Sequence, residues 1–323
     1  MAEASIPKKL QAYDDNQLSN HIETDSFDKY QQKCKPLQVK TVVNLIRGRN
    51  MFLLAATGFG KSRIPEIYLN MTTKDRTGRH IGVVIVLNPL DALGDNQVTE
   101  KIAANYTAIN LTASNFDTKA EIDVWNGVFN FIYLSPEIFL NNKTFEEIYI
   151  SPNFQKKLVL VVVDEAHMIY TWGLAETGNK VEKILARHQD QGVFRISYGN
   201  IGSALLNKNK SPLLMMSATC PPKAIEAITD CLKLTEEGQL HIIRGELTRP
   251  KIRIIRIPTS HSLCSCEDIA SIYPLAEETP SNQLVPTLIY SGTRHLTLKV
   301  LEVLAAARRT HGDHLNAGSL LGC

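Results

Sequence analysis

Blocks of apolar residues, each followed by turn residues and then by helical spacing, recur along most of the chain. Four of these blocks are short and rich in aliphatic side chains: residues 51–56, 81–87, 158–163 and 213–217. Short apolar runs bounded by turns are typical of strands that a parallel sheet buries on both faces. After the last run, a double proline precedes the helically spaced Ile225, Ile228 and Leu232. The pattern predicts an α/β fold built from βαβ units around a parallel sheet.

The pattern changes near residue 249. Residues 249–257 partly alternate basic and apolar side chains, as a half-exposed strand does. We predict a further short strand at residues 288–290 and a helix at residues 296–306. The sequence therefore predicts three parts: an N-terminal tail over residues 1–25, a first α/β lobe over residues 26–248, and the incomplete beginning of a second lobe over residues 249–323.

Composition excludes several classes of protein. The chain has 323 residues, 44% of them hydrophobic, and its 35 Lys and Arg against 33 Asp and Glu leave a net charge of +2. A strongly basic protein is excluded, while a nucleic-acid partner stays possible if positive charge gathers in a groove. The sequence has no run near the ~18 apolar residues of a membrane span and no apolar leader, which disfavours a membrane or secreted protein. Only Cys264 and Cys266 of the six cysteines are close in sequence, so reduced thiols are expected rather than a zinc site.

A glycine-rich segment between a predicted strand and a helix is the first candidate site. Residues 55–62 read AATGFGKS, in which small residues and glycines let backbone N–H groups turn inward around phosphates. Lys61 can reach the β and γ phosphates, and the Ser62 hydroxyl can bind magnesium. The predicted nucleotide-binding set is Ala56, Thr57, Gly58, Phe59, Gly60, Lys61 and Ser62. The alternative is that these glycines and the lysine occur together by chance and bind no nucleotide.

A second candidate site follows the apolar run at residues 158–163, where the chain continues Asp-Glu-Ala-His. The carboxyl ends of parallel strands share the edge of the sheet at which α/β proteins bind ligands. Asp164 would hold Mg²⁺, mostly through water, and Glu165 would orient and deprotonate an attacking water. The alternative is a solvated strand end without catalytic function.

The order and spacing of these two motifs, followed by Ser-Ala-Thr at residues 217–219, resemble superfamily 2 helicases. Further segments are similar to RecQ-type DNA helicases in particular. They are residues 35–38 (KPLQ), 88–98 (NPLDALGDNQV), 133–137 (YLSPE), 172–173 (WG), 194–198 (FRISY), 249–252 (RPKI) and 288–294 (LIYSGTR). The resemblance implies that the first lobe is a RecA-like P-loop NTPase lobe and that a second RecA-like lobe begins at its end.

The resemblance also implies residue roles. Gln38 and Lys35 would recognise adenine, because a glutamine amide can both donate and accept; the alternative for Gln38 is a solvent-facing side chain. His167 would act in the catalytic centre and couple it to Ser217 and Thr219, unless it is an ordinary core histidine. The implied nucleic-acid contacts are Pro89, Ser135, Trp172, Phe194, Arg195 and Arg294. Core aromatic residues are the alternative for Trp172 and Phe194.

The resemblance implies an ATP-dependent 3′–5′ DNA helicase with ATP and Mg²⁺ as cofactors, single-stranded or forked DNA as partner, and a nuclear location. Two departures qualify this prediction. Residues 174–193 separate the WG and FR segments, and the sequence contains no Q-x-x-G-R-x-G-R motif to supply an arginine finger. Because loss of such a finger costs about 10³–10⁵ in turnover, this C-terminally truncated chain is expected to bind Mg-ATP but to hydrolyse it slowly and not to unwind DNA by itself. An RNA helicase and a catalytically impaired binding module remain as alternatives.

Overall fold

The computed structural model describes residues 3–89, 91–173, 211–247, 252–253, 255–273 and 278–308. The described residues divide into two compact units, one within residues 3–247 and the other within residues 252–308. The predicted boundary at residue 249 falls between them, in residues that the structure does not describe.

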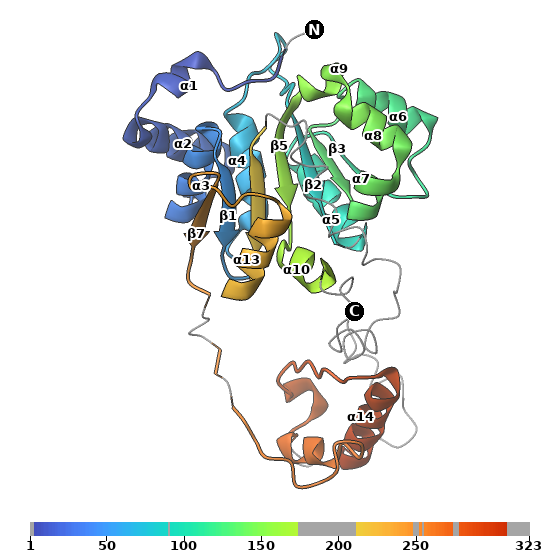
Figure 1. The fold of residues 1–323 in the computed structure, drawn as a ribbon. Helices are drawn as coiled ribbons and strands as arrows, with labels where there is room; N and C mark the ends of the chain where they lie inside the picture. Colours follow the sequence, from blue (N-terminus) through green and yellow to red (C-terminus); the bar gives the residue numbers. More distant parts are fainter. Residues whose placement is uncertain are drawn as a thin grey trace. The chain divides into compact units, whose positions relative to one another are not determined.

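The larger unit is built on a parallel sheet (Figure 1). Among its described residues, seven strands pair in the order β3-β4-β2-β5-β6-β1-β7, and every pairing is parallel. The strands are β1 (Asn50–Leu54), β2 (Val83–Leu87), β3 (Ala108–Leu111), β4 (Phe131–Leu134), β5 (Leu158–Val163), β6 (Leu213–Ser217) and β7 (Leu240–Arg244). The predicted α/β fold with a parallel sheet is confirmed, and the four predicted strands recur as β1, β2, β5 and β6.

Helices pack on both faces of the sheet (Figure 1). One face is covered by α1 (Lys8–Ala12), α2 (Asp15–Tyr30), α3 (Pro36–Ile46), α4 (Ile64–Asn70) and α5 (Asp91–Ala103). The other is covered by α6 (Thr118–Trp125), α7 (Pro136–Asn141), α8 (Lys143–Ile150), α9 (Pro152–Gln155), α10 (His167–Gly173) and α13 (Pro222–Cys231). The last of these is the helix predicted after the double proline. Within the described residues, no helix has the length and apolar character that crossing a membrane would require.

The strands supply two cores because successive side chains point to opposite faces of a sheet. In β1, Phe52 and Leu54 belong to the core under α6–α10 and α13, whereas Met51 and Leu53 belong to the core under α1–α5. Burying each such side chain contributes about 1.5–3 kcal/mol relative to leaving it exposed. The sheet is therefore a rigid central layer, and the loops at its edges are held in fixed positions.

The segment that links β1 to α4 ends with a short 3₁₀ turn, Lys61–Arg63, and α4 follows it directly. Pro65 lies in the first turn of α4, where the missing backbone N–H of proline breaks no intrahelical hydrogen bond. Pro65 is therefore compatible with a helix that begins directly after the glycine-rich segment.

The smaller unit contains one α-helix among its described residues, α14 (Arg294–Ala307), with two short 3₁₀ turns, Glu267–Ile272 and Ser281–Gln283. The helix predicted at residues 296–306 is confirmed. The strands predicted at residues 249–257 and 288–290 are wrong for the part that is described, because residues 252–253, 255–257 and 288–290 have no strand structure. Leu288 is 72% exposed and Tyr290 is 87% exposed. A strand needs a neighbour to satisfy its backbone groups, and no described segment of this unit supplies one.

Candidate functional site

Three predicted motifs meet at the carboxyl ends of the central strands of the sheet. Strand β6 lies between β1 and β5, and all three run in the same direction. Leu54 at the end of β1 pairs with Ser217 at the end of β6, and Val163 at the end of β5 pairs with Met215. The glycine-rich loop, the acidic pair and the Ser-Ala-Thr segment therefore follow adjacent strand ends, although they are far apart in sequence.

The glycine-rich loop turns through two left-handed residues, Gly58 with φ of 78° and Gly60 with φ of 89°. Only glycine adopts this backbone at little cost, so the loop's shape depends on both positions. The Lys61 ammonium donates to the backbone oxygens of Ala55 at 2.8 Å and Ala56 at 3.3 Å. The lysine thus folds back over its own loop, with its charge on the inside of the turn.

The ammonium charge of Lys61 favours the charged forms of both acids, but it is the smallest of several influences on their pKa values. Burial, followed by the charge of Glu165, nevertheless raises the net pKa of Asp164 above its usual range. The pKa of Glu165 is lowered, chiefly by its hydrogen bond with His167. A divalent cation beside Asp164 would favour its charged form, so the buried acid is suited to a metal and the half-buried acid is suited to hold a water.

His167 connects the acidic pair to the end of β6. Its Nδ1 lies 3.2 Å from Glu165 Oε2 and 2.9 Å from Ser217 Oγ. Ser217 Oγ donates to the backbone oxygen of Thr219 at 3.0 Å and accepts from its N–H at 3.2 Å. The predicted coupling residues therefore form one continuous hydrogen-bonded chain that starts at Glu165.

A pocket of about 530 Å³ lies beside the glycine-rich loop. Gln38 lines it but is buried, and both ends of its amide are bonded: Nε2 donates to the Gly60 oxygen at 2.8 Å, and Oε1 accepts from the Lys35 N–H at 2.8 Å. The alternative of a solvent-facing Gln38 is wrong. Lys35 Nζ donates to the Phe59 oxygen at 2.6 Å and lies 4.7 Å from the Phe59 ring centre. Both side chains brace the loop from the pocket side.

The predicted nucleic-acid contacts are only partly placed. Pro89 and Ser135 follow the neighbouring strands β2 and β4, whose ends are joined by a bond from the Asn88 N–H to the Leu134 oxygen at 3.0 Å. Their two loops are therefore neighbours on the edge that carries Asp164. Arg294 is exposed at the first turn of α14 in the smaller unit. The Trp172 side chain, and Phe194 and Arg195 entirely, lie outside the described residues.

Sequence reasoning missed two buried polar residues of α5 that contact this site, Gln97 and Lys101. Gln97 belongs to a segment that resembles the helicases, but its pattern assigned no role to the side chain. Lys101 stands four residues after Gln97, on the same face of the helix. Lysine is almost never buried without a partner, so a lysine on the packed face of this helix was the signal that a polar network lies there.

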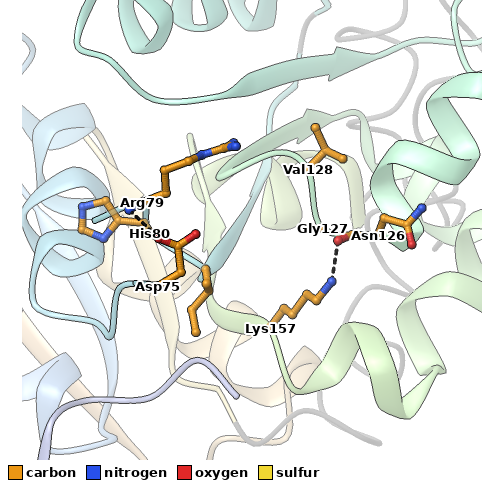
Figure 2. A pocket seen from close by; sticks show the side chains of 8 residues that line it. Asp75, Arg79, His80, Asn126, Gly127, Val128 and Lys157 are labelled. Carbon is orange, nitrogen blue, oxygen red and sulfur yellow. Dashed lines mark hydrogen bonds between the residues drawn. The ribbon is translucent and has the colours of Figure 1, made fainter. Parts of the chain in front are cut away.

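A second hollow of about 340 Å³ lies at the amino ends of the strands, opposite the candidate ATP site. Its lining comes from segments that precede β2, β4 and β5, as Figure 2 shows: Asp75, Arg79, His80, Asn126, Gly127, Val128 and Lys157. The Lys157 ammonium donates to the backbone oxygen of Asn126 across this hollow. The hollow is therefore separate from the loop that carries Lys61.

His80 beside this hollow predicts an acid sensitivity of the fold. Burial, together with the charges of Lys74 and Lys29, lowers the pKa of His80 from 6.5 to about 4. Between those values the unfolded chain binds a proton that the folded chain does not, so stability is lost as the pH falls from 6.5 towards 4. We expect His80→Gln to remove on the order of 1 kcal/mol of this loss, after allowance for solvent screening. Urea unfolding at pH 5 and pH 8 measures it, and an equal effect of the substitution at both values would contradict it.

A parallel sheet with a glycine-rich lysine loop after one strand and paired acids after a nearby strand defines the P-loop class of α/β proteins. Structures of the DUF1998 helicase MrfA share this fold. The structure bound to DNA and AMPPNP matches with a TM-score of 0.57 over 95% of this chain and 40% of its own, at 10% identity. Another MrfA structure matches with a TM-score of 0.54 over 91% of this chain and 42% of its own, at 13% identity.

Residues 35–228 match the DEAD/DEAH box helicase family, and the chain belongs to that family. It is 31% identical to ATP-dependent helicase wrn-1 of Caenorhabditis elegans over 145 residues, which is 42% of this chain and 12% of that protein. It is 29% identical to the mouse bifunctional 3′-5′ exonuclease/ATP-dependent helicase WRN over 62% of this chain and 12% of that protein. It is 26% identical to ATP-dependent DNA helicase RecQ of Haemophilus influenzae over 69% of this chain and 31% of that protein. The chain thus spans less than a third of these relatives, and the predicted resemblance to RecQ-type helicases is confirmed.

Proposed function

We propose that this chain carries the ATP-binding lobe of a RecQ-type DNA helicase that unwinds DNA with 3′–5′ polarity in recombination and repair. The observation that carries the proposal is the meeting of Lys61, Asp164 and Ser217 at one edge of the sheet. A glycine-rich lysine segment that occurred by chance would not be expected to lie beside Asp164 and Ser217. The similarity to relatives such as ATP-dependent DNA helicase RecQ of Haemophilus influenzae supports the same class of reaction.

The residues present fit a magnesium nucleotide. Gly58 has open space where a side chain would stand, so phosphate oxygens can approach the loop backbone. The Lys61 ammonium rests on two neutral carbonyl oxygens, which a charged phosphate would replace as the stronger acceptor. Ser62 and Asp164 offer the oxygen ligands that Mg²⁺ prefers, and bound Mg²⁺ would supply charge neutralisation at the phosphates.

The remaining residues of the site then have defined tasks. Glu165 orients the attacking water and accepts its proton. His167 holds Glu165 and passes a change at that carboxylate to Ser217 and on to Thr219. Lys35 and Gln38 fix the loop beside the 530 Å³ pocket, which has room for the nucleoside. Catalysis by this set is mostly positioning and charge stabilisation, as phosphoryl transfer requires.

Single-stranded or forked DNA is the proposed partner. The loops of Pro89 and Ser135 would hold phosphates without reading sequence. Trp172 and Phe194 would stack on bases, at about 1–3 kcal/mol each, and Arg195 and Arg294 would add phosphate contacts. A structure of MrfA bound to DNA, similar to this chain with a TM-score of 0.56, supports a nucleic-acid partner for this fold. A nuclear location belongs to the same proposal.

Binding and turnover of the purified 323-residue chain test the proposal. We expect a fluorescent ATP analogue to bind more tightly with Mg²⁺ than without it, and single-stranded DNA to stimulate hydrolysis more than RNA of the same length. Because this chain alone is not expected to unwind DNA, polarity is tested with partial duplexes that carry a 3′ or a 5′ tail and with a chain extended by a segment that supplies the arginine-finger motif. Failure of the analogue to bind would overturn the proposal, and stimulation by RNA alone would favour an RNA helicase instead.

A further inference from the structure

Helix α5 buries two polar side chains against the sheet. Gln97 is 9% exposed and Lys101 is 2% exposed, and their spacing of four residues places them on one face of the helix. A helix that packs on a sheet normally offers apolar side chains there, and a buried lysine costs free energy unless it is paired. Both residues therefore need partners, and the partners belong to the candidate ATP site.

Gln97 lies between the end of β2 and the acidic pair. Its Oε1 accepts from Asn88 Nδ2 at 3.1 Å, and its Nε2 points to Asp164 Oδ2 at 3.5 Å. The other Asp164 oxygen accepts from the Glu165 backbone N–H at 3.0 Å. Gln97 is thus the side chain that orients the Asp164 carboxylate from the α5 side.

Lys101 performs the corresponding task at the glycine-rich loop. Its ammonium forms a buried ion pair with Glu66 in the first turn of α4 and donates to the backbone oxygen of Ser62 at 3.3 Å. The second Glu66 oxygen accepts from the Tyr30 hydroxyl at 3.0 Å, and Tyr30 lines the 530 Å³ pocket. Because charged groups interact strongly in a buried environment, this network fixes the position of Ser62 relative to α5.

Helix α5 itself is held close to the sheet. A Cβ at Gly94 would overlap the side-chain amide of Asn110 in β3, so glycine is required for this approach. Asn110 Nδ2 also donates to Asp95 Oδ1 at 2.8 Å. The helix therefore offers Gln97 and Lys101 a fixed support.

We infer that α5 sets the separation of the two magnesium-binding groups, with Gln97 and Lys101 as positioning residues for Asp164 and Ser62. The inference rests on the proposed function.

Gln97→Leu tests the inference, because leucine retains the size and helical preference of the residue and removes both amide hydrogen bonds. We expect the affinity for a fluorescent ATP analogue without Mg²⁺ to be unchanged. The gain in affinity that Mg²⁺ confers should fall about tenfold, the lower end of what loss of a hydrogen bond to a charged group produces, because the Gln97–Asp164 contact is long at 3.5 Å. Gln155→Leu is the matched control, because Gln155 bonds to the Tyr149 oxygen on the other side of the sheet. It should keep the full gain.

A double variant separates positioning from folding. Lys101→Met alone would leave Glu66 buried and unpaired, whereas Lys101→Met with Glu66→Gln removes both charges and keeps the packing. We expect the double variant to melt within a few degrees of the wild type, and to lose at least about threefold of the gain from Mg²⁺, because the bond to the Ser62 oxygen is removed. A full gain in both Gln97→Leu and the double variant would overturn the inference, as would an equal loss of affinity with and without Mg²⁺. Absence of analogue binding by the wild type would instead overturn the proposed function.

Discussion

Lys61→Ala is expected to weaken binding of Mg-ATP about 100-fold, which corresponds to about 2.8 kcal/mol at 1.4 kcal/mol per tenfold change. Hydrogen bonds to charged groups contribute about 1.5–3 kcal/mol, and Lys61 has a phosphate as its proposed partner. In the described part of the structure its ammonium donates to the Ala55 and Ala56 oxygens, which are backbone groups of the loop itself. Removing the side chain therefore affects the bound state far more than the fold.

Isothermal calorimetry or a fluorescent analogue measures this affinity. Lys40→Ala is the matched control, because Lys40 is exposed on α3, outside the residues that line the pocket. It changes the net charge by the same amount, so any general effect of charge appears in both variants. Equal affinities of Lys61→Ala and the wild type would place the phosphates elsewhere and contradict the assignment of the loop.

Glu165→Gln is expected to slow hydrolysis by about 10²–10⁴ while nucleotide affinity changes little. The amide keeps the size of the side chain but cannot take a proton from water. His167 lowers the pKa of Glu165, so the wild-type group stays charged to a lower pH than an ordinary glutamate. The rate should therefore keep its dependence on Glu165 down to pH values below the usual range of a glutamate, and then fall as the carboxylate becomes protonated.

Single-turnover hydrolysis of radiolabelled ATP measures the chemical step, and the same samples give the affinity. Glu147→Gln, an exposed glutamate of α8, is the control for the lost charge. A Glu165→Gln variant that hydrolyses ATP at the wild-type rate would show that another group activates the water. A parallel loss of affinity would show that Glu165 holds the nucleotide rather than the water.

The strands differ in how well their sequences predict them. β5 consists of six apolar residues in succession, and β2 of five, so the pattern itself predicts that both faces of these strands are buried. β3 and β7 form the two edges of the sheet, and they include the polar residues Asn110, His241 and Arg244. Their patterns carry no clear period, and pairing with β4 and β1 makes them strands.

The candidate site shows the same division. The loop around Lys61 and the acids at Asp164 and Glu165 were predictable, because glycine dihedral freedom and a strand end are local properties of the chain. The bonds of Gln38 to Gly60 and of Gln97 towards Asp164 were not, because each joins elements that are distant in sequence. The roles of these residues in nucleotide binding stay predictions until the variants are measured.

Sequence by itself determined the class of this protein: a parallel α/β lobe, a loop shaped for phosphates and an acidic strand end, each encoded by a few consecutive residues. Tertiary structure alone decided the order of the strands, which brings β1, β6 and β5 together, and the partners of the buried charges. It also decided against the strands predicted at residues 288–290 and in the described part of residues 249–257. The physical reason is that backbone preference acts between near neighbours in the chain, whereas burial, ion pairing and strand pairing depend on which distant segment packs against each residue.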